Sequence, residues 1–116
     1  MSFYALDMPQ HIASELDDAM KHCQLLKELM PDIHFIIVFV RDAVLLKERI
    51  NKWKSHLAKS GMLWICWPKK SSKIETDITR EVVREVGLSS GLVDVKVCAV
   101  DDDWSGLKFV YRTKDR

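Results

Sequence analysis

The sequence contains few of the residues that mark specialised classes of protein. It has three cysteines, three prolines and four glycines in 116 residues, and its net charge is +1. This near balance of charge gives no sign of a general nucleic-acid or membrane-surface binder. No apolar run is long enough to cross a bilayer, and the first residues lack the basic and apolar segments of a signal peptide. We therefore expect one cytoplasmic domain over residues 1–116.

The cysteines and histidines form no recognisable pattern. Cys23, Cys66 and Cys98 are widely spaced, without a C-x-x-C pair, and each lies in an apolar run. This placement is typical of buried free thiols, with a nucleophile or a metal ligand as the alternative. The four histidines are scattered without the paired spacing of metal ligands. We expect no metal site.

Two apolar runs predict strands that are buried on both faces. They cover residues 33–40, "IHFIIVFV", and residues 62–68, "MLWICWP". Nearly continuous apolar runs of this length are typical of parallel sheets. Between them, apolar residues at helical spacing predict a helix over 43–59, capped by Asp42 and ended by Gly61.

The second half of the chain continues the alternation. A helix that begins at Thr76 or Asp77 and ends at Gly87 should lead into a strand over 92–100. The "DDDWSG" turn at 101–106 then returns the chain as an antiparallel strand over 107–112.

The first thirty residues allow two interpretations. Apolar residues keep a helical spacing from Ile12 up to Pro31, which favours one long helix. "FYAL" before Pro9 instead favours a short strand, a helix over 9–20 and a weak strand around 22–27. We favour the second interpretation.

The predicted fold is a single-domain, three-layer, Rossmann-like α/β sheet. It is mostly parallel, lies between helices and ends in an antiparallel C-terminal hairpin. We expect the strand over 62–68 to run through its middle, buried by helices on both faces. This topology resembles the carboxyl half of a class I methyltransferase in a degenerate form.

A methyltransferase needs a glycine-rich turn after its first strand, and "LDMPQH" has no glycine there. No G-x-G-x-x-G, P-loop or G-x-S-x-G motif is present, so we expect no cofactor and no binding of S-adenosylmethionine.

Longer segments resemble one family. "FVRD", "GMLWICWPKKSSKIETDI" and "VVREVGLSSGLVDVKVCAVDDDWSGLKFVYR" are similar to small, mostly bacterial proteins known only as a domain of unknown function. The resemblance is strong over residues 33–116 and most specific in "WPKKSS" and "DWSGLKF". It is weaker at "ALDMPQ", which is similar to a strand-end "N-A-P-E" element. The resemblance implies a fold but no activity, cofactor or partner.

The resemblance also bears on the N-terminus. Members of the family usually carry extra residues before the strand-end element, so the chain is expected to be shortened there. A face near residues 3–30 would then lack its cover, and we expect a homodimer.

The first candidate site follows the two buried strands. Open α/β sheets bind ligands at the carboxyl ends of their strands, and Arg41 and Asp42 follow one of them. Lysines beside hydroxyl donors and a helix N-terminus would suit an anion such as a phosphate. The alternative is a solvated loop that serves solubility. The candidate ligand-binding residues after the other strand are Lys69, Lys70, Ser71, Ser72, Thr76 and Asp77.

The second candidate site is the "DDDWSG" turn. Asp101 and Asp103 can cap backbone N–H groups there, and Trp104 can plug the core or form the wall of a pocket. Asp101, Trp104 and Ser105 complete the ligand-binding set, and we expect Lys69 or Lys70 to point toward the cleft beside them. These carboxylates have no visible partner base or nucleophile, so no catalytic residue is predicted.

The tryptophans support neither nucleic acid nor membrane as a partner. Trp53, Trp64 and Trp67 fit core or interface positions better than an exposed stacking platform. We expect a non-catalytic binding or regulatory module for a small anionic or phosphate-bearing ligand, rather than an enzyme. The alternatives are a protein–protein interaction scaffold or homodimeric subunit without a ligand, and an uncharacterised enzyme.

Overall fold

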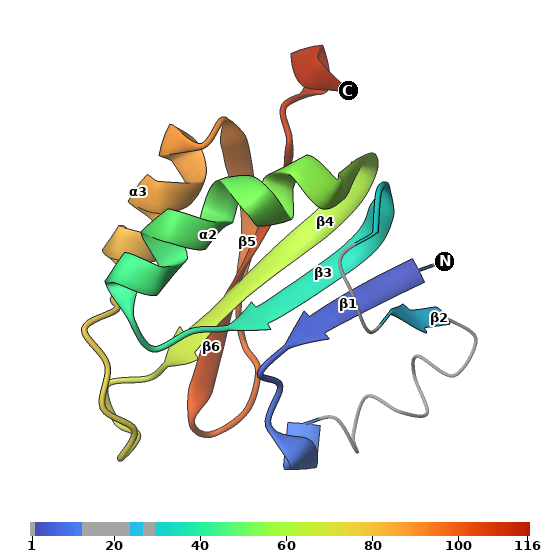
Figure 1. Cartoon of the computed structure of the whole chain (residues 1–116). Helices are drawn as coiled ribbons and strands as arrows, with labels where there is room; N and C mark the ends of the chain where they lie inside the picture. Colours follow the sequence, from blue (N-terminus) through green and yellow to red (C-terminus); the bar gives the residue numbers. More distant parts are fainter. Residues whose placement is uncertain (1, 13–23, 27–29) are drawn as a thin grey trace.

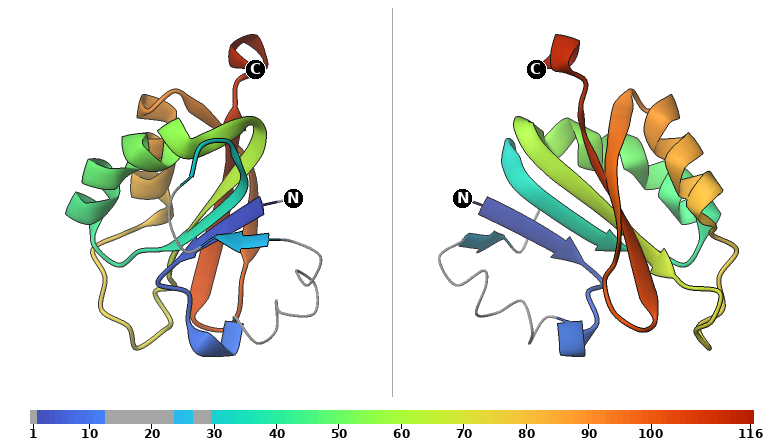
Figure 2. Two further views of the ribbon diagram at one scale, coloured as in Figure 1. Left: turned by 45° about the vertical axis from the view of Figure 1, so that its right-hand side comes forward. Right: turned by 180° about the vertical axis from the view of Figure 1, so that it is seen from behind.

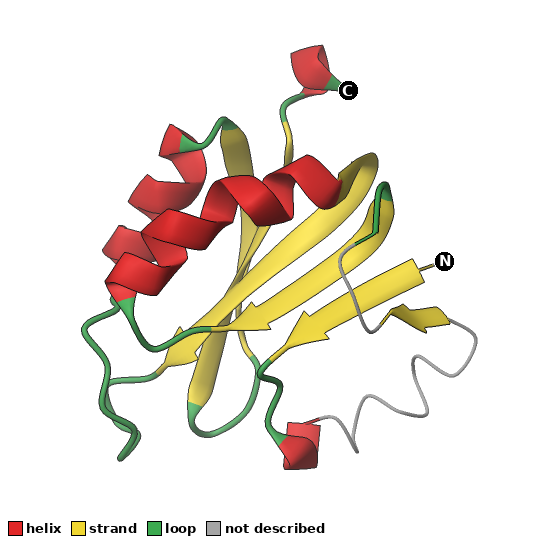
Figure 3. Ribbon diagram, in the orientation of Figure 1, coloured by secondary structure: helices red, strands yellow, loops and turns green. Residues whose placement is uncertain are grey.

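A six-stranded sheet organises the chain in the computed structural model (Figure 1), which describes residues 2–12, 24–26 and 30–116. The strand order is β2-β1-β3-β4-β6-β5. The strands are β1 (Ser2–Leu6), β2 (Gln24–Leu26), β3 (Ile33–Phe39), β4 (Leu57–Pro68), β5 (Leu92–Ala99) and β6 (Trp104–Tyr111). The helices are α2 (Ala43–His56) and α3 (Arg80–Ser89), and a short 3-10 turn, η1 (Thr113–Asp115), follows β6. Figure 3 shows the same elements by type.

The Rossmann-like α/β prediction is confirmed, but the sheet is mixed. β1 pairs in parallel with β2 and β3, β3 pairs in parallel with β4, and β6 is antiparallel to both β4 and β5. The antiparallel strand was expected at the end of the sheet and instead lies inside it. Its residues Leu107 and Phe109 are fully buried, whereas β5 leaves Val95 57% and Val97 43% exposed. The inner strand of the hairpin is thus the one whose side chains are more deeply buried.

The N-terminal prediction of strand, helix and strand is confirmed at both strands. β1 and β2 are present, so one long helix from Ile12 to Pro31 is wrong. Residues 10–12 are helical, while most of the predicted helix over 9–20, together with Cys23, lies outside the described residues. Because β1 is paired on both sides, its backbone offers no free edge. The predicted homodimer, which rested on an uncovered face in this region, stays a prediction.

Both described helices cover the same face of the sheet (Figure 2). The core on that face joins Leu46, Ile50 and Trp53 of α2 and Val83 of α3 to the sheet. On the other face, Ile12 packs with a smaller apolar cluster formed by Ile37, Phe39, Cys66 and Trp104. The sequence predicts helices on both faces, and a second helical layer on this face stays a prediction.

β4 runs through the middle of the sheet, as predicted, between β3 and β6. Its side chains alternate between the two faces of the sheet. Leu63, Ile65 and Trp67 belong to the helix-side core, and Trp64 and Cys66 belong to the opposite cluster. A strand buried on both faces needs apolar residues at consecutive positions, which explains the run "MLWICW".

Two glycines were wrongly taken as helix ends. α2 ends at His56, and Gly61 lies inside β4 beside an irregularity in the pairing of β3 with β4. A Cβ on Gly61 would lie 2.7 Å from the backbone oxygen of His34, so the strands approach closely there. Gly87 lies within α3, and the left-handed residue after that helix is Gly91, with φ of 99°.

The thiols differ in burial. Cys66 is free and buried, as expected, but Cys98 is free and only half-buried because it lies on the edge strand β5. Burial raises the pKa of the Cys66 thiol, which keeps it protonated and unreactive. Among the described residues, no helix has the length and apolar character that crossing a membrane requires.

Candidate functional site

The loops that follow β3 and β4 meet at the carboxyl edge of the sheet and share the N-terminus of α2. Asp42 caps that helix, as predicted, and its Oδ1 accepts from the N–H groups of Val44 at 2.8 Å and Leu45 at 3.4 Å. Asp77 reaches across from the β4–α3 loop, and its Oδ1 accepts from the N–H of Ala43 at 2.9 Å. Two carboxylates therefore occupy the first three N–H groups of α2, which satisfies donors that the helix itself cannot.

Thr76 joins the same two loops from the other side. Its Oγ1 donates to the backbone oxygen of Arg41 at 2.7 Å and accepts from the N–H of Ile78 at 3.0 Å. Neither Thr76 nor Asp77 begins the following helix, contrary to the sequence prediction. α3 begins at Arg80 and is capped by Thr79, which accepts from the N–H of Val82 at 3.3 Å. Contacts to the β3–α2 loop hold Thr76 and Asp77 outside the helix.

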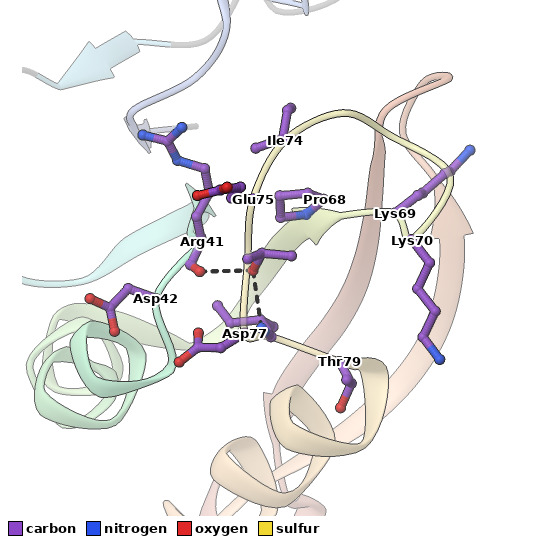
Figure 4. A pocket seen from close by; sticks show the side chains of 11 residues that line it. Arg41, Asp42, Pro68, Lys69, Lys70, Ile74, Glu75, Asp77 and Thr79 are labelled. Atoms are coloured by element: carbon purple, nitrogen blue, oxygen red, sulfur yellow. Dashed lines mark hydrogen bonds between the residues drawn. The ribbon is translucent and has the colours of Figure 1, made fainter.

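These two loops enclose a cavity of about 820 Å³ (Figure 4). Lys69 and Lys70 lie at the start of the β4–α3 loop. Figure 4 shows that their side chains extend away from Arg41 and Asp42. The two lysines therefore form an outer wall, and Arg41 is the cation on the opposite side. The lining residues are Arg41, Asp42, Pro68, Lys69, Lys70, Ile74, Glu75, Thr76, Asp77, Ile78 and Thr79.

A second cavity, of about 290 Å³, adjoins the first on the side of the lysines. Lys69 and Lys70 line both cavities, and Ser105 of β6 lines the second. The N–H of Lys69 donates to the backbone oxygen of Asp103 at 2.8 Å, which ties the lysine loop to the turn between β5 and β6. The structure thus brings both lysines together with Ser105. Asp101 and Trp104 line neither of these two cavities.

Ser71 and Ser72 shape the loop that carries the lysines. The N–H of Ser72 donates to the backbone oxygen of Lys69 at 3.0 Å, and its Oγ accepts from the N–H of Ile74 at 3.3 Å. Ser71 is exposed. Neither serine lines these two cavities.

Asp101 organises the turn between β5 and β6. Its Oδ1 accepts from the N–H groups of Asp103 at 2.9 Å and Trp104 at 2.8 Å, as the sequence predicted for this turn. Its Oδ2 lies 2.6 Å from Nε2 of His11, which links the turn to the segment after β1. Desolvation raises the pKa of Asp101, but the hydrogen bonds from His11 and the backbone outweigh it, so the pKa lies below its usual value. Asp101 is therefore a structural carboxylate.

Trp104 serves mainly as a core residue. It is 6% exposed and packs edge-to-face on Phe39, with ring centroids 5.1 Å apart. Its remaining surface lines a third cavity, of about 490 Å³, with Asp7 and Met8 after β1 and with Arg41 after β3.

Sequence reasoning missed this third cavity. β1 pairs with β2 on one side and with β3 on the other, and crevices at such switch points commonly hold ligands. Asp7 has φ of 55°, in the left-handed region that favours glycine, directly after β1. The available signal was the position of "LDMPQH" at the end of a predicted strand.

No group of three or more potential metal ligands is found in residues 2–12, 24–26 and 30–116. The described part of the site thus offers cations, carboxylates and hydroxyls, but no assembled metal centre. Arg41, Lys69 and Lys70 are the groups that could hold an anion.

The chain belongs to a family described as a protein of unknown function, DUF3052, whose model matches residues 2–113. The resemblance noted in the sequence is thereby confirmed. None of the curated proteins matches the chain.

Solved structures with the same fold are methyltransferases and related proteins. A LepI variant in complex with SAH and a substrate analogue has a TM-score of 0.70 at 8% identity, over 95% of this chain and 42% of that one. The magnesium protoporphyrin IX methyltransferase of Synechocystis PCC 6803 with bound SAH has a TM-score of 0.62 at 9% identity, over 94% of this chain and 64% of that one. A fibrillarin pre-rRNA processing protein of Methanococcus jannaschii has a TM-score of 0.55 at 18% identity, over 93% of this chain and 55% of that one.

These likenesses show the fold alone. The chain spans between 42% and 64% of the length of these three proteins. The methyltransferase-like topology predicted from the sequence is confirmed. Because methyltransferases are enzymes, the likeness lends no support to the expectation that this protein is not one.

Proposed function

We propose that the protein binds a small anionic ligand at the carboxyl edge of its sheet, in the cavity of about 820 Å³ between the β3–α2 and β4–α3 loops. The observation that carries the proposal is this cavity, with Arg41 on one wall and Lys69 and Lys70 on the other. Its volume falls in the range of about 300–1,000 Å³ that is typical of small-molecule sites. Open α/β sheets bind ligands at this edge.

Three cations and three carboxylates line the cavity, and hydrogen bonds from α2 already engage two of the carboxylates. The acidic lining residues are Asp42, Asp77 and Glu75. The first two already accept hydrogen bonds from the N-terminus of α2, where the helix dipole also balances negative charge. Glu75 is then the one acidic lining residue without such a partner, against the three cations Arg41, Lys69 and Lys70.

A thermal-shift screen tests the proposal. The probes are nucleotides, coenzyme A derivatives, phosphorylated metabolites and S-adenosylmethionine. We expect a saturable rise in melting temperature with an anionic probe, since a ligand that binds only the folded state stabilises it. Arg41→Gln should weaken the affinity for that probe about tenfold, because it removes a charged hydrogen-bond donor.

Arg49→Gln is the matched control. Arg49 lies on the exposed side of α2 and lines none of the three cavities at this edge, so its replacement should leave the affinity unchanged. Equal binding by the wild type and Arg41→Gln would refute the proposed site. The absence of any saturable shift, together with stable self-association, would instead support the interaction scaffold or homodimeric subunit.

A further inference from the structure

The smaller cavity beside the lysines has a larger excess of positive charge than the larger cavity. Its uncharged lining residues are the apolar Trp67, Pro68, Ile78 and Val97 and the hydroxyl-bearing Thr79 and Ser105. The charged residues around it are Lys69, Lys70 and Arg80, with Glu81 as the single acid. Three cations against one carboxylate leave an excess of two positive charges.

In the part of the chain that the structure describes, these three cations have no counter-ion. Within the described residues, the side chains of Lys69, Lys70 and Arg80 form no hydrogen bond or ion pair, and the ion pairs found there join His11 to Asp101 and Arg84 to Asp94. Cations that line one small cavity repel one another and raise the positive potential within it. A bound dianion would remove that repulsion.

The two cavities adjoin each other. They share Pro68, Lys69, Lys70, Ile78 and Thr79, so the lysines stand between a large compartment and a small one. The small cavity, at about 290 Å³, suits a phosphate or pyrophosphate group rather than a whole cofactor. The large cavity, at about 820 Å³, has room for an organic group.

From this arrangement we infer that the ligand is a phosphate ester, with its phosphate held by Lys69, Lys70 and Arg80 and its organic part held beside Arg41. The inference rests on the proposed function and assigns the anionic group to the smaller cavity. Ser105 lines this cavity, and its hydroxyl is a group that can donate to a phosphate oxygen. Thr79 already accepts a hydrogen bond from α3, so its hydroxyl proton is free to point at the same anion.

Two probes separate the compartments. Pyrophosphate carries only the anionic group, and adenosine diphosphate carries an organic group as well. In calorimetry at low ionic strength, Lys70→Gln and Arg80→Gln should each weaken the binding of both probes about tenfold. Arg41→Gln should weaken adenosine diphosphate and leave pyrophosphate unchanged, because pyrophosphate does not reach the larger cavity.

Lys73→Gln is the control for charge on the same loop. Lys73 lines neither cavity, so its loss should change either affinity by less than about twofold. Amide chemical shifts on adding pyrophosphate should change at Arg80, Val97 and Ser105, which report on the small cavity independently of the variants.

The outcomes distinguish this inference from the proposed function. If both probes bind and depend on Arg41 but not on Lys70 or Arg80, the proposed site stands and the phosphate subsite is refuted. If neither probe binds although another anion does so with dependence on Arg41, the phosphate ester is refuted alone. If no anion binds at all, both fail.

Discussion

Gly87 shows at the scale of one residue how tightly α3 packs on the sheet. It lies within the helix, and a methyl group added to it would overlap the ring of Phe109, with Cδ1 at 2.7 Å. Phe109 is fully buried at the centre of the core and has no room to move aside. Gly87→Ala should therefore lower the free energy of unfolding by about 1–3 kcal/mol, as overpacking does. The better helix propensity of alanine, about 1 kcal/mol, offsets only part of that loss. Denaturant titration measures the difference.

Ser89→Ala on the same helix is the control. Ser89 is exposed, so its change in stability should stay within about 0.5 kcal/mol. A Gly87→Ala protein that is more stable than the wild type would show that α3 does not sit this close to β6.

At the scale of the elements, a side chain of the β4–α3 loop caps the helix α2. Asp77 lies just before α3, but its carboxylate accepts a hydrogen bond from the N–H of Ala43 and so caps α2. Asp77→Ala should lower the free energy of unfolding by about 1 kcal/mol, as the loss of a helix cap does. It should also speed hydrogen exchange at the amide of Ala43 while leaving Val82, which Thr79 caps, unchanged.

Glu75→Ala tests whether any acid on this loop has the same effect. Glu75 is exposed and caps neither helix, so its removal should alter neither exchange rate. Faster exchange at Val82 in the Asp77 variant would instead restore the assignment made from the sequence, in which Asp77 caps α3.

At the scale of the whole molecule, the chain has a methyltransferase-like fold but lacks the glycine-rich turn that binding of S-adenosylmethionine needs. The sheet matches those of methyltransferases, yet the turn after β1 carries Asp7 and Met8 where a close approach of backbone to cofactor favours glycine. Both residues line the switch-point cavity of about 490 Å³, and neither is a glycine that would leave the backbone open to a ligand. We therefore expect calorimetry to detect no binding of S-adenosylmethionine or SAH at micromolar concentrations. Micromolar binding would overturn this expectation and move the functional site from the lysine loop to the β1 turn.

Much of the fold followed from local patterns in the sequence. The continuous apolar runs predicted β3 and β4, Asp42 predicted the start of α2, and the aspartates predicted the turn before β6. Each of these features has a signature within a short stretch of sequence: an apolar run for a buried strand, a carboxylate next to the amides that it caps, and aspartates within a turn.

The partners of individual side chains were decided by the tertiary structure. Glycine commonly ends helices, which is why the sequence predicts that role for Gly61 and Gly87. The structure instead requires glycine at these positions because the backbone of the neighbouring strand β3 and the ring of Phe109 leave no room for a side chain. Thr76 and Asp77 were assigned to the nearest helix, whereas Arg41 and Ala43, more than thirty positions away, bind them. The sequence by itself determined that two lysines and two serines, Lys69–Ser72, directly follow a buried strand. That Lys69 and Lys70 divide two cavities, and that Ser105 and Arg80 join them there, depended on strand order and packing between distant segments, which local patterns do not encode.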